Sequence, residues 1–282
     1  MSQVQNPKQM LGLVFATSNQ GRLENVTDSS HKPKIPNRMP KQASYSLAQF
    51  SNFLPITTAL YDVWRVKSIG LLTRENYSLE REFTLMLEWL NVQPKQTFLD
   101  VGTSTGNYAR VLAKAGASVT AIDISKAFLM RAAQNTSDLE IVFEQANAEA
   151  LPYADSSFDG VTLGATLNEF FHTNAALAEI ARVLKPGGKL FMMYLCESDT
   201  SFGRLVQLPF KLSSVRFPNR EAVRLYLSSL GFERPRAEVR RAVAFELFVK
   251  TGRDLEPNSE PNSKPIRKLT REPGKPARDT LE

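Results

Sequence analysis

Residues 97–116 read TFLDVGTSTGNYARVLAKAG, and this stretch decides the fold that we predict. A short apolar run over 97–101 is followed by a loop with two glycines and then by a helical pattern over 107–114. Gly102 and Gly106 let the backbone pass close to a ligand, and the free N–H groups at the start of the helix point into the same space. The stretch therefore predicts a strand, a ligand-binding turn and a helix, in that order.

Strand and helix patterns alternate beyond this stretch. The predicted elements that follow are strand Ser118–Ile122, helix Lys126–Gln134, strand Ile141–Gln145, strand Phe158–Leu163, helix Asn174–Leu184, strand Lys189–Leu195, a helix opened by Asn219 and closed by Gly231, and strands Phe232–Val239 and Val243–Lys250. The central strand runs are short and apolar on both faces, as in parallel strands that helices cover. The order predicts an α/β fold: a Rossmann-like, doubly wound, mostly parallel sheet of seven strands with a C-terminal antiparallel hairpin.

The two ends of the chain differ in composition from its middle. Residues 1–44 are rich in Pro, Ser, Asn and Gln, and residues 251–282 contain almost no apolar side chains, so we expect disordered extensions at both ends. The folded domain is then 45–250. We expect it to contain N-terminal helices within 54–92 (Leu54–Leu72 and Leu79–Leu90), a ligand-binding core over 97–195 and a lid or insertion over 196–218.

Composition excludes several classes of function. The net charge of +6 resides mostly in the ends, so the folded part is nearly neutral, which argues against nucleic acid as the main partner. One cysteine excludes an internal disulfide framework, and two histidines make a histidine-based metal site poor in ligands, so we predict no metal. These features favour a cytoplasmic protein. The basic 204–241 region is either an ordinary solvated face or a surface for peripheral membrane contact.

The glycine loop by itself leaves three interpretations open. A dinucleotide site fits poorly, because Ser104 takes the place of the second glycine of G-x-G-x-x-G. Residues 102–106 match the G-x-S-x-G nucleophile elbow of a serine hydrolase, with Asp155 or Asp159 and then His172 following in the expected order. The third interpretation is an S-adenosylmethionine turn, which needs a second acidic residue at the end of the next strand.

The third interpretation agrees with the sequence at several independent places. Asp123 ends the next strand, where a carboxylate can accept hydrogen bonds from both hydroxyls of a ribose. Asn147 or Glu149 can lie beside an adenine edge, and KPGG at 185–188 forms the turn before the fifth strand. The motifs LDVGTSTG, AIDIS, NAEALPYADSSFDGV and EIARVLKPGGKL occur in one order and spacing. As a set, they resemble the class I S-adenosylmethionine-dependent methyltransferases of the ubiquinone/menaquinone-biosynthesis type (methyltransferase type 11).

The resemblance covers about residues 98–195, with a looser likeness in ALYDVWR at 59–65, and it implies roles for individual residues. Asp100 would orient the loop and approach the methionine ammonium. The other implied cofactor contacts are the backbone at Gly102 and Thr103, close packing at Gly106, the ribose at Asp123, and the adenine at Ile124, Asn147 and Ala148. Ser104 stands where the family most often has glycine, and Asn147 where aspartate is commonest, so both departures affect the cofactor site.

The acceptor side is less constrained, because methyl transfer mainly requires alignment in a dry pocket. The loop after the fourth strand offers Glu169 and His172 as candidate bases and Asn168 and Phe171 as candidate acceptor contacts, with Tyr61 approaching from the first helix. We predict a methyltransferase that acts on a small apolar or lipid-like molecule such as a prenylated quinol. A serine hydrolase that uses Ser104, and a relative that binds a nucleoside or a partner without turnover, remain the alternatives.

Overall fold

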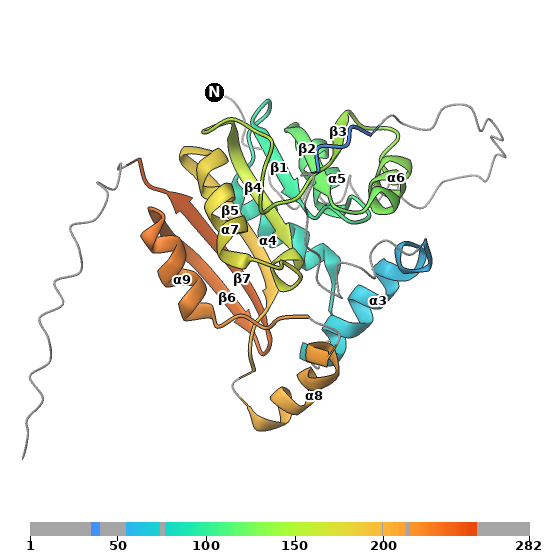
Figure 1. Ribbon diagram of the computed structural model, residues 1–282, viewed down its shortest axis with the longest axis vertical. Coiled ribbons are helices and arrows are strands. Elements are labelled where there is room, and N and C mark those ends of the chain that lie inside the picture. Colours follow the sequence, from blue (N-terminus) through green and yellow to red (C-terminus); the bar gives the residue numbers. More distant parts are fainter. Residues whose placement is uncertain (1–34, 40–54, 74–76, 199, 213–214, 253–282) are drawn as a thin grey trace, which may run out of the picture.

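The computed structural model describes residues 35–39, 55–73, 77–198, 200–212 and 215–252 (Figure 1). Most of both predicted extensions, and residues 45–54 of the predicted domain, lie outside the described residues. The described elements are α3 (Pro55–Thr73), α4 (Leu79–Leu90), β1 (Thr97–Val101), α5 (Asn107–Lys114), β2 (Ser118–Asp123), α6 (Lys126–Asn135), β3 (Ile141–Gln145), β4 (Phe158–Gly164), the 3-10 turn η1 (Thr166–Asn168), α7 (Thr173–Val183), β5 (Leu184–Leu195), α8 (Ser201–Leu212), α9 (Arg220–Ser229), β6 (Phe232–Arg240) and β7 (Val243–Lys250).

One seven-stranded sheet organises the molecule, in the order β3-β2-β1-β4-β5-β7-β6. Strands β1 to β5 are parallel, and β7 lies antiparallel between β5 and β6. The chain moves outward from β1 through β2 to β3, then returns to the other side of β1 with β4. This reversal lies beside β1, so the carboxyl ends of β1 and β4 form the crevice where doubly wound sheets bind ligands. The predicted fold, including the closing hairpin, is confirmed.

Helices cover both faces of the sheet, as the apolar strand runs require. On one face, Leu99 and Val101 of β1 pack in a buried cluster with α7 and α9. On the other face, Phe98 of β1 joins Phe191 and Met193 of β5 in a cluster with α4 and α5. Alternate residues of one strand thus enter different cores, which fixes the register of the sheet.

The KPGG stretch differs from its expected role as a turn before the fifth strand. Strand β5 begins at Leu184, which pairs with Phe158, and regular pairing resumes only at Lys189 with Gly160. The residues between them form a bulge within the strand, and Gly187 has φ 76 there. A glycine tolerates this left-handed conformation without steric cost, so the bulge is compatible with the sequence.

A short described segment of the N-terminal region runs beside the edge strand. Asn37 forms a parallel bridge with Gln145 of β3, and Arg38 pairs with Glu144 at 3.0 Å. Residues 35–39 therefore differ from the disordered extension that the composition predicts for 1–44. They also cover part of an otherwise open sheet edge, where unpaired backbone groups would need another partner.

Helix α3 contacts α8, and Figure 1 shows the two helices beside each other at the lower end of the molecule. In the part of the chain that the structure describes, no helix has the length and apolar character needed to cross a membrane. Helix α3 lies against the loop after β1, at the carboxyl edge of the sheet.

Candidate functional site

The loop after β1 winds tightly through three residues with positive φ. These are Gly102, Ser104 and Gly106, with φ values of 66, 50 and 86. The N–H of Thr103 donates to the carbonyl of Ile122 at 2.9 Å, which fixes the loop against β2. A left-handed φ is easy for glycine but costs a serine on the order of 1 kcal/mol. Position 104 thus favours glycine on backbone grounds alone, independently of any clash between a side chain and the cofactor.

The side chain of Ser104 points along the loop. Its hydroxyl donates to the carbonyl of Gly102 at 3.3 Å, and it also interacts with the phenol of Tyr61. The hydroxyl is therefore engaged within the protein. Ser104 thus adopts the left-handed conformation of the loop, with its hydroxyl bonded to protein groups.

Asp123, the last residue of β2, connects two loops. Its Oδ2 accepts the backbone N–H of Ser104 at 3.0 Å, and its Oδ1 accepts that of Ser125 at 2.8 Å. Burial raises the pKa of this carboxyl to about 6, although the two backbone donors act in the opposite direction. Each carboxylate oxygen has a further lone pair, and the side chain lines the main pocket, so Asp123 can accept a pair of ligand hydroxyls.

Asp100 lies in β1 under the same loop. Its two carboxylate oxygens accept the hydroxyls of Thr103 at 2.6 Å and Thr162 at 2.8 Å. Burial raises its pKa to about 6, against the lowering effect of these hydrogen bonds. Asp100 borders a second pocket of about 280 Å³ together with Arg65. A carboxylate and a guanidinium that line the same pocket can pair with the ammonium and the carboxylate of an amino acid, respectively.

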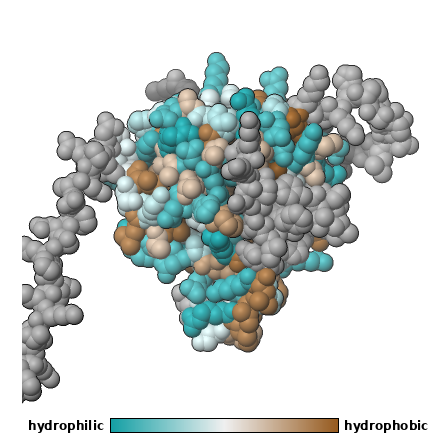
Figure 2. All heavy atoms as spheres, in the orientation of Figure 1, coloured by the Kyte–Doolittle hydropathy of each residue, from teal (hydrophilic) through white to brown (hydrophobic). Residues whose placement is uncertain are grey.

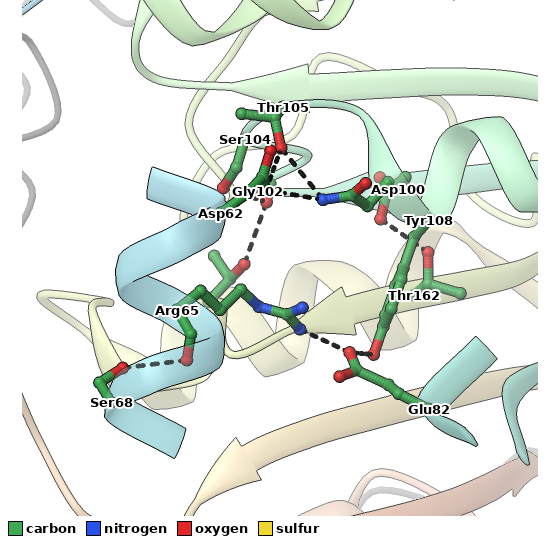
Figure 3. Close-up of polar contacts among 12 residues, drawn as sticks. Asp62, Arg65, Ser68, Glu82, Asp100, Gly102, Ser104, Thr105, Tyr108 and Thr162 are labelled. Carbon is green, nitrogen blue, oxygen red and sulfur yellow. Dashed lines mark hydrogen bonds and ion pairs between the residues drawn. The ribbon is translucent and has the colours of Figure 1, made fainter. Parts of the chain in front are cut away.

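Arg65 belongs to a buried polar cluster that joins three helices (Figure 3). Its guanidinium pairs with Glu82 of α4, which also accepts the phenol hydroxyl of Tyr108 from α5. Glu82 is fully buried, and its Oε2 has no hydrogen-bond partner among the described residues. Buried charges require such pairing, so the cluster sets the position of α3 relative to the core.

A second contact fixes α3 directly on the glycine loop. Oδ1 of Asp62 accepts the hydroxyl of Thr105 at 2.8 Å and the side-chain amide of Asn107 at 2.9 Å. Figure 3 shows Asp62 and Arg65 on the same helix, with Asp62 directed toward the glycine loop and Arg65 toward Glu82. Sequence reasoning missed Asp62 and Glu82. The only signal for Asp62 was its place within ALYDVWR, the stretch of looser family likeness.

The main pocket has a volume of about 490 Å³ and lies at the carboxyl ends of β1, β2 and β4. It brings together residues that are far apart in sequence: Tyr61, Val101, Gly102, Ser104, Ile122, Asp123, Ile124, Ala146, Asn147, Ala148, Thr166, Glu169 and Phe170. Nine of these lie in the three predicted cofactor motifs, at 101–104, 122–124 and 146–148, so the structure gathers these motifs around one cavity as the fold requires.

Polar contacts on the far side of the pocket constrain Asn147. Its Oδ1 accepts the backbone N–H of Glu149 at 3.0 Å, which leaves one lone pair for a ligand amino group. On the near side, Tyr61 packs edge-on against Phe128, with ring centroids 5.0 Å apart. Burial, followed by the negative charge of Glu169, raises the pKa of Tyr61 to about 12, so this phenol is protonated at neutral pH.

The loop after β4 separates the predicted acceptor residues. Asn168 is buried, and its side chain bonds the backbone of Leu195 and Arg216, with Nδ2 donating to both carbonyls and Oδ1 accepting the N–H of Leu195. It therefore ties loops together and does not border the main pocket, contrary to its expected substrate contact. Phe171 and His172 also lie outside that pocket and contact each other, with ring centroids 4.6 Å apart. Only Glu169 of the two candidate bases borders the cavity.

The hydrolase interpretation fails on geometry. Ser104 follows the carboxyl end of β1, whereas Asp159 lies at the opposite end of the sheet, where it accepts the N–H of Thr97 at 2.8 Å. Asp155 pairs with Arg182 before β4 begins. Because β1 and β4 are parallel, neither aspartate can reach the Ser104 end. The order of residues that suggested a triad does not correspond to a triad in space.

Comparisons with known proteins find methyltransferases. A family model described as a methyltransferase domain matches residues 99–192. The demethylmenaquinone methyltransferase of Renibacterium salmoninarum is 39% identical over 106 residues, which cover 38% of this chain and 44% of the relative. The ubiquinone/menaquinone biosynthesis C-methyltransferase UbiE of Shewanella pealeana is 34% identical over 144 residues, 48% of this chain and 54% of the relative. The chain thus spans about half the length of these two relatives.

A longer match comes from the protein of the same name in Brucella abortus, which is 31% identical over 180 residues, 53% of this chain and 67% of the relative. Among solved structures, a Haemonchus contortus phosphoethanolamine N-methyltransferase 2 in complex with S-adenosyl-L-methionine has a TM-score of 0.58 at 16% identity, covering 75% of this chain and 61% of that one. The [4+2]-cyclase SpnF has a TM-score of 0.57 at 19% identity, covering 79% and 99%. At these identities the structural likeness shows the fold alone.

Proposed function

The chain belongs to the class I S-adenosylmethionine-dependent methyltransferases of the ubiquinone/menaquinone-biosynthesis type, and we propose that it methylates a small, apolar, lipid-like acceptor such as a prenylated quinol. The observation that supports methyl transfer best is one continuous crevice made of two pockets. They share Tyr61, Gly102 and Ser104, with Asp123 at one end and Asp100 with Arg65 at the other.

The residues of this crevice fit S-adenosylmethionine at both ends of the molecule. Asp123 has two lone pairs available to a ribose diol, and the flanking side chains Ile124 and Ala148 offer an apolar wall for the adenine. At the other end, Asp100 and Arg65 match an ammonium and a carboxylate. We assign Gly102 to close backbone approach, Gly106 to the start of α5, and Asn147 to the adenine amino group.

Thr103 receives a different role from the one that the family likeness implies. Its N–H is already used by Ile122, and its hydroxyl donates to Asp100. We therefore assign Thr103 the role of holding Asp100 in place. Other backbone groups of the loop would contact the methionine end of the cofactor. When bound, the cofactor supplies an electrophilic methyl group on a positively charged sulfur. The chain itself must orient the acceptor and exclude water.

Glu169 is the base that the geometry favours. It follows η1 at the carboxyl edge of the sheet and borders the main pocket, near the phenol of Tyr61. A carboxylate there can accept the hydroxyl proton of a quinol ring, which makes the adjacent ring carbon nucleophilic. His172 is exposed, and its backbone N–H donates to Glu149 at 2.8 Å. Its side chain is the weaker candidate. Phe170, buried beside Glu169, replaces Phe171 as the aromatic wall for the acceptor.

A second function remains in view because the fold of this chain is also that of a protein named as a cyclase. A relative that binds the cofactor without transferring its methyl group would have the same crevice. The two are separated by incubating the purified chain with cofactor labelled on the methyl group and with a quinol and lipid extract. Methyl transfer predicts label in an apolar product and release of S-adenosylhomocysteine. Tight cofactor binding with no labelled product from any fraction would support the non-catalytic alternative.

A further inference from the structure

Helix α8 is oriented with its apolar side toward solvent. Its exposed residues Phe202, Leu205, Leu208 and Leu212 are spaced three, three and four apart, which places them on one face of the helix. They are 55%, 64%, 50% and 77% exposed. Figure 2 shows the resulting hydrophobic surface at the lower end of the molecule, where Figure 1 places α8.

The opposite side of α8, which faces the domain, buries a polar residue. Gln207 is fully buried, its amide donates to the carbonyl of Cys196 at 2.9 Å, and its Oε1 accepts the N–H of Ser198 at 3.2 Å. These bonds fix the rotation of the helix about its axis. The helix therefore cannot turn its leucines inward without leaving buried polar groups unpaired, and such a loss is costly.

Basic residues border the apolar face. On an ideal helix, Arg204 and Lys211 lie between the apolar face and the buried side. Arg204 also borders a surface pocket of about 860 Å³, which is lined by Arg220 and Arg234 and by the carboxylates of Glu197 and Glu221. Three described acidic residues near this pocket have basic partners. Glu197 lies 3.6 Å from Lys211, Glu221 pairs with Arg224, and the buried Glu246 pairs with Arg220 and Arg234. The side chains named in this paragraph comprise five basic and three acidic groups, so their net charge is positive.

We propose that α8 is a membrane-docking helix, which lies in the interface of an anionic lipid bilayer with Phe202, Leu205, Leu208 and Leu212 among the acyl chains. An apolar stripe bordered by arginine and lysine, on a helix too short to span a bilayer, is the arrangement of interfacial helices. The pocket bounded by Arg204, Arg220 and Arg234 then faces the headgroup region and takes lipid phosphate groups. Charge complementarity favours an anionic lipid surface as the partner of this face, because an uncharged apolar partner would form no ion pairs with the surrounding basic residues.

The proposal sharpens the expectation of membrane contact through the basic 204–241 region. The basic residues supply attraction to the surface, but the four apolar side chains supply insertion. Docking does not depend on the identity of the acceptor or on turnover. It is tested without cofactor or substrate, so its failure and that of the proposed function are separable.

The test is co-sedimentation of the full chain with vesicles of phosphatidylcholine alone or with a third of phosphatidylglycerol. We expect binding to the anionic vesicles, weakened by salt, and much weaker binding to the neutral ones. The double variant Leu205→Ser/Leu208→Ser should lower the partition coefficient at least about tenfold. The matched control is Leu225→Ser on α9, where the leucine is 55% exposed outside this face, and its binding should be unchanged.

A charge variant separates insertion from attraction. Arg204→Gln/Lys211→Gln should lower binding to anionic vesicles roughly tenfold and remove most of its salt dependence, while binding to neutral vesicles stays the same. Wild-type chain that remains in solution with both vesicle types overturns the proposal. So does equal binding by the leucine variant. A dimer in lipid-free analytical ultracentrifugation that Leu205→Ser/Leu208→Ser dissociates would instead assign the face to a second copy of the chain.

Discussion

The carboxylate of Asp123 accepts the backbone N–H of Ser104 at 3.0 Å, so the end of β2 holds the loop that follows β1. One side chain thus shapes the glycine loop and also faces the main pocket. We expect Asp123→Ala to lower the affinity for S-adenosylmethionine at least about tenfold, because it removes two acceptors for the ribose and releases the N–H of Ser104. Isothermal titration calorimetry measures this change. Asp138→Ala, at an exposed position after α6, is the control, and unchanged affinity in a folded Asp123→Ala protein would remove the ribose assignment.

Cofactor binding should weaken in mild acid. Burial raises the pKa of both Asp100 and Asp123 to about 6, and the ionised forms favour the ammonium and the ribose hydroxyls of the ligand. Affinity should therefore fall by about tenfold or more between pH 7.5 and pH 5, measured by calorimetry.

Loss of binding in acid is distinguishable from acid unfolding. A carboxyl whose pKa is higher in the folded than in the unfolded state binds more protons when folded, over the pH range between the two values. These two groups therefore stabilise the uncomplexed fold as the pH falls from about 6 toward 4. Thermal unfolding at the same pH values is the control. Affinity that stays flat from pH 7.5 to pH 5 would argue against both carboxylates as ligand contacts.

Ser104→Gly should keep or raise stability. The substitution relieves the left-handed φ of 50, and the gain of up to about 1 kcal/mol is partly offset by the greater entropy of glycine in the unfolded chain. Ser104→Val, a β-branched residue at the same φ, should lose about 1–2 kcal/mol. Chemical denaturation followed by circular dichroism measures both. Cofactor affinity of the glycine variant should remain within a few-fold of wild type, and loss of all methyl transfer there would reveal a chemical role for the hydroxyl.

Glu169→Gln should lower the methyl-transfer rate with little effect on cofactor affinity. The amide keeps the size of the side chain but cannot accept the acceptor proton, so we expect a decrease of about a hundredfold in kcat. His172→Asn, three residues further along the same loop at an exposed position, should leave kcat within a few-fold. The reverse result, with His172→Asn impaired and Glu169→Gln active, would transfer the role of base to the histidine.

Glu82→Ala should destabilise the fold strongly. It leaves the Arg65 guanidinium buried without its partner, and breaking a buried pair in this way costs about 3–5 kcal/mol. Arg81→Ala, one residue earlier on α4, breaks an ion pair with Glu238 whose arginine is 52% exposed, and should cost no more than about 1 kcal/mol. Urea denaturation of the two variants compares them directly. Similar midpoints for both would show that the Arg65–Glu82–Tyr108 cluster is not an anchor of α3.

The strand pattern was predictable because it depends on local burial. The runs at Thr97–Val101 and Val243–Lys250 are apolar on both faces, and the structure places both strands at those bounds. Asp123 was predictable for a related reason. The end of a buried parallel strand is a defined place at the ligand edge, so an acidic residue there is visible in the sequence.

Contacts between distant segments were not predictable in this way. The sequence predicted a lid or insertion over 196–218 but did not specify which side of α8 faces the domain, because that side is fixed by the bonds of Gln207 to the backbone of Cys196 and Ser198. Asn168 looked like a ligand contact because of its loop, whereas its partners at Leu195 and Arg216 come from later parts of the chain. The pairing of Glu82 with Arg65 likewise depends on how two helices meet, which periodicity does not specify.

Gly102 and Thr166 restrict how this site can diversify. A Cβ added at Gly102 would lie 2.3 Å from the side chain of Thr166, so the threonine fills the space that any larger residue at 102 would need. The two residues come from loops that we assign to different molecules, the first to the cofactor and the second to the acceptor side. Changes in acceptor preference that alter Thr166 therefore act on the cofactor loop as well. Directed evolution of this protein should sample positions 102 and 166 jointly, because a side chain at 102 fits only beside a smaller residue at 166.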